Sequence, residues 1–234
     1  MRILALETTE KIGSVAAVCD GNLLSELELS RRQRSAQSLA PALQTLLQQV
    51  GWRPVDVDLV AVTSGPGSFT GLRVGVTTAK VFAFAAEAEV LGVDTLETVA
   101  AAAPKEVLAL SAAIDAQRGE IVVRSFAQDT EGWFRPTGPM ELVAVDQWLG
   151  DLAAGATITG PVLRRLVGRV PDHVTVPDPK YWLPKAANVA RLAERDYAAG
   201  RRDDLWSLAP HYSRRSAAEE KIDRAASGGR AQES

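Results

Sequence analysis

Residues 63–75 read Thr-Ser-Gly-Pro-Gly-Ser-Phe-Thr-Gly-Leu-Arg-Val-Gly. The apolar run at 59–62 before them predicts a buried strand, and the residues after them predict a helix over about 70–88. Gly65 and Gly67 permit backbone angles that are closed to other residues, and the hydroxyl side chains that follow can cap the helix. Free backbone N–H groups at this helix terminus could bind an anion. The stretch is not a P-loop, because no Gly-Lys-Ser/Thr follows at the required spacing, and it also lacks the dinucleotide-binding spacing.

The residues before this stretch predict three strands and a helix. The strands are expected at 2–8, 13–19 and 23–29, with Asp20-Gly21 as a hairpin turn. Apolar residues then recur at helical spacing up to Gly51, at Leu39, Ala40, Leu43, Leu46, Leu47 and Val50. We expect Ser38 to cap this helix, which places Pro41 in the first turn, where no backbone donor is needed.

The second half of the chain repeats this pattern. A strand at 106–114 ends in Asp115, as the first strand ends in Glu7, and further strands are expected at 119–126 and from Trp133. We therefore predict a duplicated α/β protein with halves 1–104 and 105–215. Its last helix, at 187–200, should pack back on the first half, and residues 216–234 should form a frayed tail. Two mixed-sheet halves with flanking helices resemble the actin-like (ASKHA) fold of the actin, hexokinase and sugar-kinase superfamily.

That superfamily clasps nucleotide phosphates between two such hairpins, and its acids hold Mg²⁺ through water. The candidate cofactor-binding residues here, as remnants of these phosphate loops, are Glu7, Thr8, Thr9 and Asp115. The alternative carries about equal weight, because acids often end strands simply as turn formers.

Composition excludes several classes of protein. One cysteine and two histidines allow neither a disulfide framework nor a four-ligand structural zinc site. The formal net charge of −3 provides no broad basic face. The N-terminus lacks the layout of a signal peptide, and no uncharged apolar run reaches 18 residues, so we expect a cytoplasmic protein without membrane contact.

The glycine-rich stretch resembles the signature of the TsaB family, also called YeaZ. Further matches are residues 3–9, Arg34-Ser35 through Pro41, Asp115 through Glu120, and the short segment 210–212. The resemblance covers residues 1–125 well and the remainder loosely. It implies an actin-like fold and a role in making threonylcarbamoyladenosine in tRNA, next to the anticodon.

TsaB proteins are similar to TsaD, the transferase of that pathway, which carries a metal-binding histidine pair. Thr95 and Val99 stand where those histidines would be. A hydroxyl and a branched alkyl group cannot replace two imidazoles on a metal. We therefore expect no catalytic residue, no metal and no required cofactor here, and leave open only a weak or regulatory nucleotide.

The resemblance implies partners. TsaB proteins pair with TsaD through their two N-terminal helices, with the ATPase TsaE in a ternary complex, and could self-pair when TsaD is absent. Residues 72–86 carry only two charges, so their helix is either buried or covers a partner. Candidate interface residues are Leu39, Leu43, Leu46, Leu72, Val76, Ala79, Lys80 and Ala83. The alternative, a central helix inside its own domain, is about as well supported by the pattern. Contacts to tRNA could use the arginines of 31–34 or 201–202.

Two enzyme classes remain as rivals. An ATP-dependent phosphotransferase of the same fold needs an adenosine site, and Thr159-Gly160-Pro161 matches such a segment poorly. A peptidase needs a histidine beside a nucleophile. His173 falls in a Pro/Asp-rich loop, His211 lies close to the expected tail, and Cys19 is expected to be buried in mid-strand.

Overall fold

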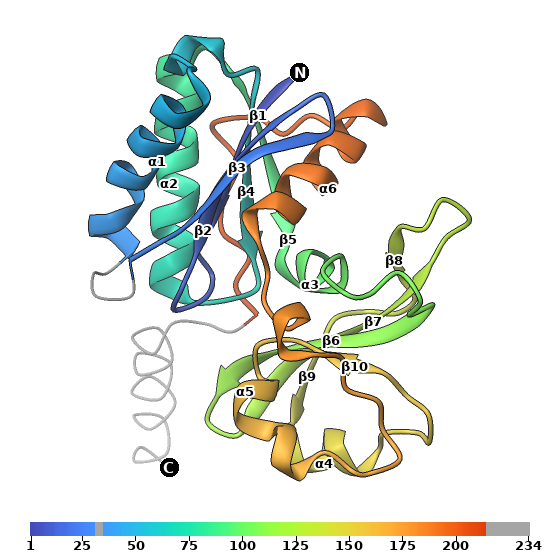
Figure 1. The fold of residues 1–234 in the computed structure, drawn as a ribbon. Coiled ribbons are helices and arrows are strands. Elements are labelled where there is room, and N and C mark those ends of the chain that lie inside the picture. Colours follow the sequence, from blue (N-terminus) through green and yellow to red (C-terminus); the bar gives the residue numbers. More distant parts are fainter. Residues whose placement is uncertain (31–34, 214–234) are drawn as a thin grey trace, which may run out of the picture.

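The computed structural model describes residues 1–30 and 35–213, which form two α/β halves stacked one above the other (Figure 1). The predicted tail at 216–234 and the arginines of 31–34 lie outside the described residues.

The first sheet has the strand order β3-β2-β1-β4-β5. Its strands are β1 (Arg2–Glu7), β2 (Ser14–Cys19), β3 (Asn22–Glu28), β4 (Leu59–Gly65) and β5 (Glu89–Asp94). Side chains alternate between the two faces, as the period of a strand requires. Leu4 and Leu6 of β1 pack against helices α1 (Ser35–Val50) and α2 (Phe69–Ala86), whereas Ile3 and Ala5 pack against α6 (Ala186–Ala198). The sheet is therefore buried on both faces.

The second sheet has the order β10-β6-β7-β8, with β9 also paired to β7. Its strands are β6 (Ala109–Gln117), β7 (Glu120–Gln128), β8 (Phe134–Pro136), β9 (Glu141–Ala144) and β10 (Ile158–Thr159). One face packs against α4 (Val145–Gly150) and α5 (Leu163–Leu166), and the other packs against α3 (Thr95–Ala100). Short 3₁₀ turns lie at η1 (Pro54–Asp56), η2 (Val167–Arg169) and η3 (Pro179–Tyr181).

The two sheets repeat one topology. β1 is antiparallel to β2 and parallel to β4, and β6 is likewise antiparallel to β7 and parallel to β10. β4 and β10 both run into a Gly-Pro pair, in which Gly65 has φ +132° and Gly160 has φ +126°. These values lie where other residues are strained. The predicted actin-like fold is confirmed, and the Gly160-Pro161 pair is the second-half counterpart of Gly65-Pro66.

Several element boundaries differ from the prediction. α1 begins at Ser35, so Ser38 is not its cap and Pro41 lies inside the helix. Its ring removes the hydrogen bond that would reach back to the carbonyl of Gln37, and the Thr45 hydroxyl donates to the Pro41 carbonyl at 2.9 Å. The strand expected at 106–114 runs from Ala109 to Gln117, because the β6–β7 register continues past Asp115.

The chain returns to the first sheet after η3. α6 covers one face of that sheet, and Asp203 forms an isolated bridge with Val90 on β5. The Asp203 carboxylate also accepts a hydrogen bond from the Gly92 backbone at 2.8 Å. Both ends of the described chain therefore lie against the same sheet. None of the helices in the described part is long and apolar enough to cross a bilayer.

Candidate functional site

The turn after β1 carries three of the four candidate cofactor residues, and the structure buries all three. Glu7 and Thr8 are fully buried and Thr9 is 3% exposed. The Glu7 carboxyl accepts hydrogen bonds from the Thr9 backbone at 2.6 Å and from the Thr9 hydroxyl at 2.5 Å. Burial raises the pKa of Glu7 to about 8, against the lowering effect of these bonds. Glu7 is therefore largely protonated at neutral pH. An acid that holds Mg²⁺ would be ionised and face a cleft, whereas Glu7 is enclosed.

The glycines of the signature let helix α2 lie directly on this turn. A Cβ at Gly71 would stand 1.9 Å from the Thr8 carbonyl oxygen, and one at Gly75 would stand 2.2 Å from the Thr8 hydroxyl. The Thr8 hydroxyl donates to the Gly71 carbonyl at 2.8 Å. Glycines four residues apart lie on one face of a helix, so this row is a packing surface for the β1–β2 turn.

The polar groups at the N-terminus of α2 are hydrogen-bonded to other groups of the same chain. Ser68 is the N-cap of α2, and its hydroxyl accepts a hydrogen bond from the Gly71 backbone at 3.2 Å. The Ser68 backbone N–H in turn donates to the Thr9 carbonyl at 3.1 Å. The expectation of an anion cradle is therefore corrected at Thr8, Thr9 and Gly71, whose polar groups are used to join the turn to the helix.

Two unpartnered polar atoms lie side by side beneath this turn. Glu7 and Thr63 occupy the position after the last paired residues of the neighbouring parallel strands β1 and β4. Both follow the face of the sheet that α6 covers, given the alternation along each strand. Among the described residues, Glu7 Oε2 and Thr63 Oγ1 are buried without a hydrogen-bond partner. Such atoms are costly to leave unsatisfied, so this edge of the sheet places polar side chains where the rest of the face is apolar.

The groove between the halves is formed by residues next to the predicted ones. Burial, and the nearby Asp115 carboxylate, raise the pKa of Glu10 to about 7, whereas the Arg164 guanidinium opposes the rise. Asp115 itself is exposed, accepts from the Gln117 backbone at 2.9 Å and pairs with Arg165 at 3.1 Å. Sequence reasoning missed Glu10, although it lies three residues after the Glu7 that was chosen.

This groove offers little room. The cavity beside Ser14, Glu26 and Arg164 measures about 150 Å³, whereas ligand pockets usually span about 300–1,000 Å³. Its lining combines the carboxylates of Glu26 and Glu28 with the cations of Arg164 and Lys185.

Helix α3 carries Thr95 and Val99, the two residues that the resemblance places at the positions of a metal-binding histidine pair. Thr95 is buried at its first turn with an unpartnered hydroxyl, and Val99 packs into the core of the second half. Residues 1–30 and 35–213 contain no group of three or more His, Cys, Asp or Glu side chains that could hold a metal ion. The Asp94 carboxylate caps α3 through the Glu97 backbone at 2.9 Å and lies 3.6 Å from Arg124 of β7. Asp94 therefore joins the two halves.

The apolar candidate interface residues are buried within the chain itself. The seven apolar ones are at most 5% exposed, and six of them form the core between α1, α2 and the first sheet. The Lys80 ammonium is held by the carbonyls of Trp206 and Leu208, at 2.9 and 3.0 Å. In this structure these side chains hold the chain's own helices and C-terminal segment to its sheet.

The outward faces of α1 and α2 have a different composition. α1 contains no charged residue, and Arg73 is the single exposed charge of α2. Val81 and Phe84 of α2 are 63% and 64% exposed, and Trp206 beside them is 73% exposed. We call these three residues the α2 apolar patch. Sequence periodicity finds the buried face of a helix. It therefore did not predict this patch, which lies on the exposed face of α2.

Comparison with known proteins finds similarity to proteins that make threonylcarbamoyladenosine in tRNA. The family model of TsaD, tRNA N6-adenosine threonylcarbamoyltransferase, matches residues 22–133. The chain is 37% identical over 134 residues to the tRNA threonylcarbamoyladenosine biosynthesis protein TsaB of Escherichia coli, and 30% identical over 149 residues to that of Bacillus subtilis. YeaZ from Pseudomonas aeruginosa superposes with a TM-score of 0.77 at 28% identity, over 90% of this chain and 99% of that one. The chain is therefore similar to TsaB proteins in sequence and in fold.

The matches cover part of each curated TsaB sequence. They span 56% and 64% of this chain, and 58% and 65% of the E. coli and B. subtilis proteins. A more distant actin-like neighbour, an activator of 2-hydroxyisocaproyl-CoA dehydratase from Clostridium difficile with bound ADPNP, has a TM-score of 0.50 at 11% identity. That likeness shows the fold alone.

The remaining candidate residues make contacts within the chain. The His173 ring contacts the Leu152 carbonyl at 3.1 Å, and the His211 backbone donates to the Ser64 carbonyl at 2.6 Å. Cys19 is half-buried rather than fully buried. Arg201 pairs with Asp196 and Asp203, so its guanidinium is already engaged within the chain.

Proposed function

We propose that this chain is the non-catalytic partner of TsaD in the threonylcarbamoylation of the tRNA adenosine next to the anticodon. Similarity supports the pathway, because the curated relatives that the chain matches are named as tRNA threonylcarbamoyladenosine biosynthesis proteins. Within the complex the chain binds TsaD through α1 and α2, and the ATPase TsaE joins them.

The α2 apolar patch is the observation that carries the proposal. Large exposed apolar side chains gathered on one face mark an interaction site. Here Val81 and Phe84 lie on α2, with Trp206 beside them, and α1 and α2 together carry one exposed charge in a chain that is 24% charged. Interface centres are depleted in charge and enriched in aromatic residues. In the absence of TsaD the same face pairs with a second copy of the chain.

The buried site supports the non-catalytic part of the proposal. Glu7 is enclosed and largely neutral, Thr8 and Thr9 are used in packing, and Val99 fills the core where TsaD has a metal ligand. The chain would therefore contribute a surface to TsaD rather than reacting groups. A stand-alone phosphotransferase is the weaker candidate, and tight ATP binding by the isolated chain in calorimetry would favour it.

The experiment is reconstitution with TsaD and TsaE from the same organism, ATP, the threonylcarbamoyl donor and unmodified tRNA. Modified adenosine is scored by mass spectrometry of the digested tRNA. We expect modification when all three proteins are present and little when this chain is omitted. Full activity of TsaD and TsaE alone, or activity of this chain alone, would contradict the proposal.

A further inference from the structure

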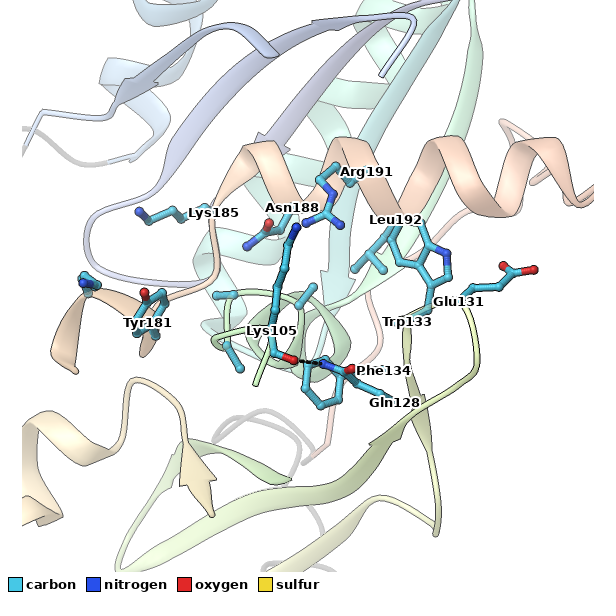
Figure 2. A pocket seen from close by; sticks show the side chains of 15 residues that line it. Lys105, Gln128, Glu131, Trp133, Phe134, Tyr181, Lys185, Asn188, Arg191 and Leu192 are labelled. Carbon is cyan, nitrogen blue, oxygen red and sulfur yellow. Dashed lines mark hydrogen bonds between the residues drawn. The ribbon is translucent and has the colours of Figure 1, made fainter. Parts of the chain in front are cut away.

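A basic pocket of about 660 Å³ lies between the first turns of α6, the end of α3 and the β7–β8 turn (Figure 2). It is separate from the turn that the glycine row packs against. Its floor includes Ala101–Ala103 and Phe134, and Gln128 fixes one wall by donating to the Lys105 carbonyl at 3.2 Å. Its volume is that of a ligand pocket.

Four cations converge on this pocket from three segments: Lys105, Lys180, Lys185 and Arg191. Glu131 is the single carboxylate among the lining residues. Within residues 1–30 and 35–213, no carboxylate lies at ion-pair distance from any of the four. Figure 2 shows the Lys105 side chain extending toward Asn188 and Arg191 across the opening. A chain of net charge −3 therefore concentrates unpaired positive charge at one hollow.

Aromatic rings hold part of this charge in place. The Arg191 guanidinium lies 5.2 Å from the centre of the Trp133 ring, and Lys180 lies 4.9 Å from that of Tyr181. Arg195 lies over the same tryptophan but is paired with Glu97 at 2.8 Å. Cation–π contact orients a cation while leaving its remaining N–H groups free. Arg191 and Lys180 are thus placed without being neutralised.

The N-terminus of α6 does not itself provide anion-binding groups. The Ala186 N–H donates to the Ser14 hydroxyl at 2.8 Å, and the Ala187 N–H donates to the Glu26 carboxylate at 3.1 Å. Compact polyphosphates are usually cradled by backbone N–H groups. Separate side-chain cations suit successive phosphodiesters instead, each of which carries one charge.

We propose that this pocket binds the phosphodiester backbone of an RNA strand. The inference rests on the proposed function, which supplies tRNA as the RNA, and it assigns to this chain a contact with the tRNA of its own. In this proposal Lys105, Lys185 and Arg191 bind phosphates inside the pocket, and Lys180 binds the RNA strand at the edge of the pocket. The Trp133 ring holds the Arg191 guanidinium in position.

The test measures binding of a fluorescein-labelled, unmodified tRNA transcript to the full chain by fluorescence anisotropy at several salt concentrations. The double variant Lys105→Ala/Lys185→Ala removes two pocket charges that make no ion pair. The matched control, Arg53→Ala/Arg169→Ala, removes two exposed charges elsewhere, which pair with Asp56 and Asp146. Thermal melts establish that both variants fold.

We expect the pocket variant to bind more weakly, and its slope of log K against log salt to be about 1.4 shallower, at about 0.7 per lost phosphate contact. The ratio of wild-type to variant affinity then shrinks by about sevenfold between 50 and 200 mM salt. The control keeps the wild-type affinity and slope.

Three results would overturn this inference: no tRNA binding by the wild-type chain at low salt, equal slopes for the pocket variant and the wild type, or ATP binding that depends on Lys105 and Lys185 while tRNA binding does not. The last result would assign the pocket to a free nucleotide. None of them depends on whether TsaD needs the chain, so failure here and failure of the proposed function are distinguishable.

Discussion

Phe84 of α2 meets Trp206 of the C-terminal segment edge to face, with ring centroids 5.8 Å apart and planes inclined by 62°. Both rings remain largely exposed. The Lys80 ammonium fixes this segment on α2 through the carbonyls of Trp206 and Leu208. The two aromatic rings therefore form one surface although they are 122 residues apart in sequence.

The first prediction concerns Phe84→Glu. Because the ring is at the surface, its loss should cost folding at most about 1 kcal/mol, the scale of one aromatic pair. A charge at the centre of an apolar interface should weaken TsaD binding by about 2 kcal/mol or more, about 30-fold. Isothermal titration calorimetry with TsaD measures this change. Leu108→Glu, at an exposed position of the other half, is the control and should bind normally. Equal binding by both variants would exclude this patch from the interface.

The second prediction separates packing from partner binding on α1. Leu46 is fully buried, so Leu46→Ala should lower the free energy of unfolding by about 2–5 kcal/mol. Gln48→Ala, at an exposed position of the same helix, should change it by less than about 0.5 kcal/mol. Urea denaturation measures both. A mild effect at Leu46 would mean that α1 is not held by the core described above.

The third prediction tests the glycine row. Gly75→Ala places a methyl group 2.2 Å from the Thr8 hydroxyl and should destabilise the chain by about 1–3 kcal/mol. Gly168→Ala meets no atom within 4 Å and serves as the control. Thr8→Ala removes the clashing oxygen, so a double-mutant cycle should show the Gly75→Ala cost falling in the Thr8→Ala background. Strict additivity would contradict the contact.

The fourth prediction concerns Glu7 and pH. The pKa of Glu7 rises from 4.5 to about 8 in the folded chain, so the folded state holds a proton that the unfolded state loses. This contribution to stability is complete below pH 4.5 and is lost as the pH rises through about 8. The loss is at most about 5 kcal/mol. Glu7→Gln cannot ionise, so its stability should gain on the wild type as the pH rises from 5 to 8. Parallel stability profiles for the two proteins would show that Glu7 titrates normally.

Sequence reasoning predicted the duplicated fold because hydrophobic runs, turns and acids recur in both halves. It placed most strands within a few residues, since strand cores such as 59–62 have a strong apolar signal. It placed the start of α1 too late, because Pro41 favours a first turn and the structure tolerates it in the interior.

The site was harder to predict. Periodicity located the apolar faces of α1 and α2 but does not distinguish a core from an interface. Leu43 and Val76 were therefore named as candidate interface residues in place of Phe84. The direction of Glu7 depends on the β1–β4 register, and the basic pocket joins Lys105 to Lys185 through tertiary packing. Neither relationship leaves a local pattern in the sequence.

The most direct test of the account is the initial rate of tRNA threonylcarbamoylation by TsaD and TsaE with no added chain, with the wild-type chain and with Phe84→Glu. We predict a high rate with the wild type, and rates near the chain-free baseline with Phe84→Glu that recover when the variant is added in large excess. A rate with Phe84→Glu equal to the wild type at limiting concentration, or no dependence on the chain at all, would contradict the account.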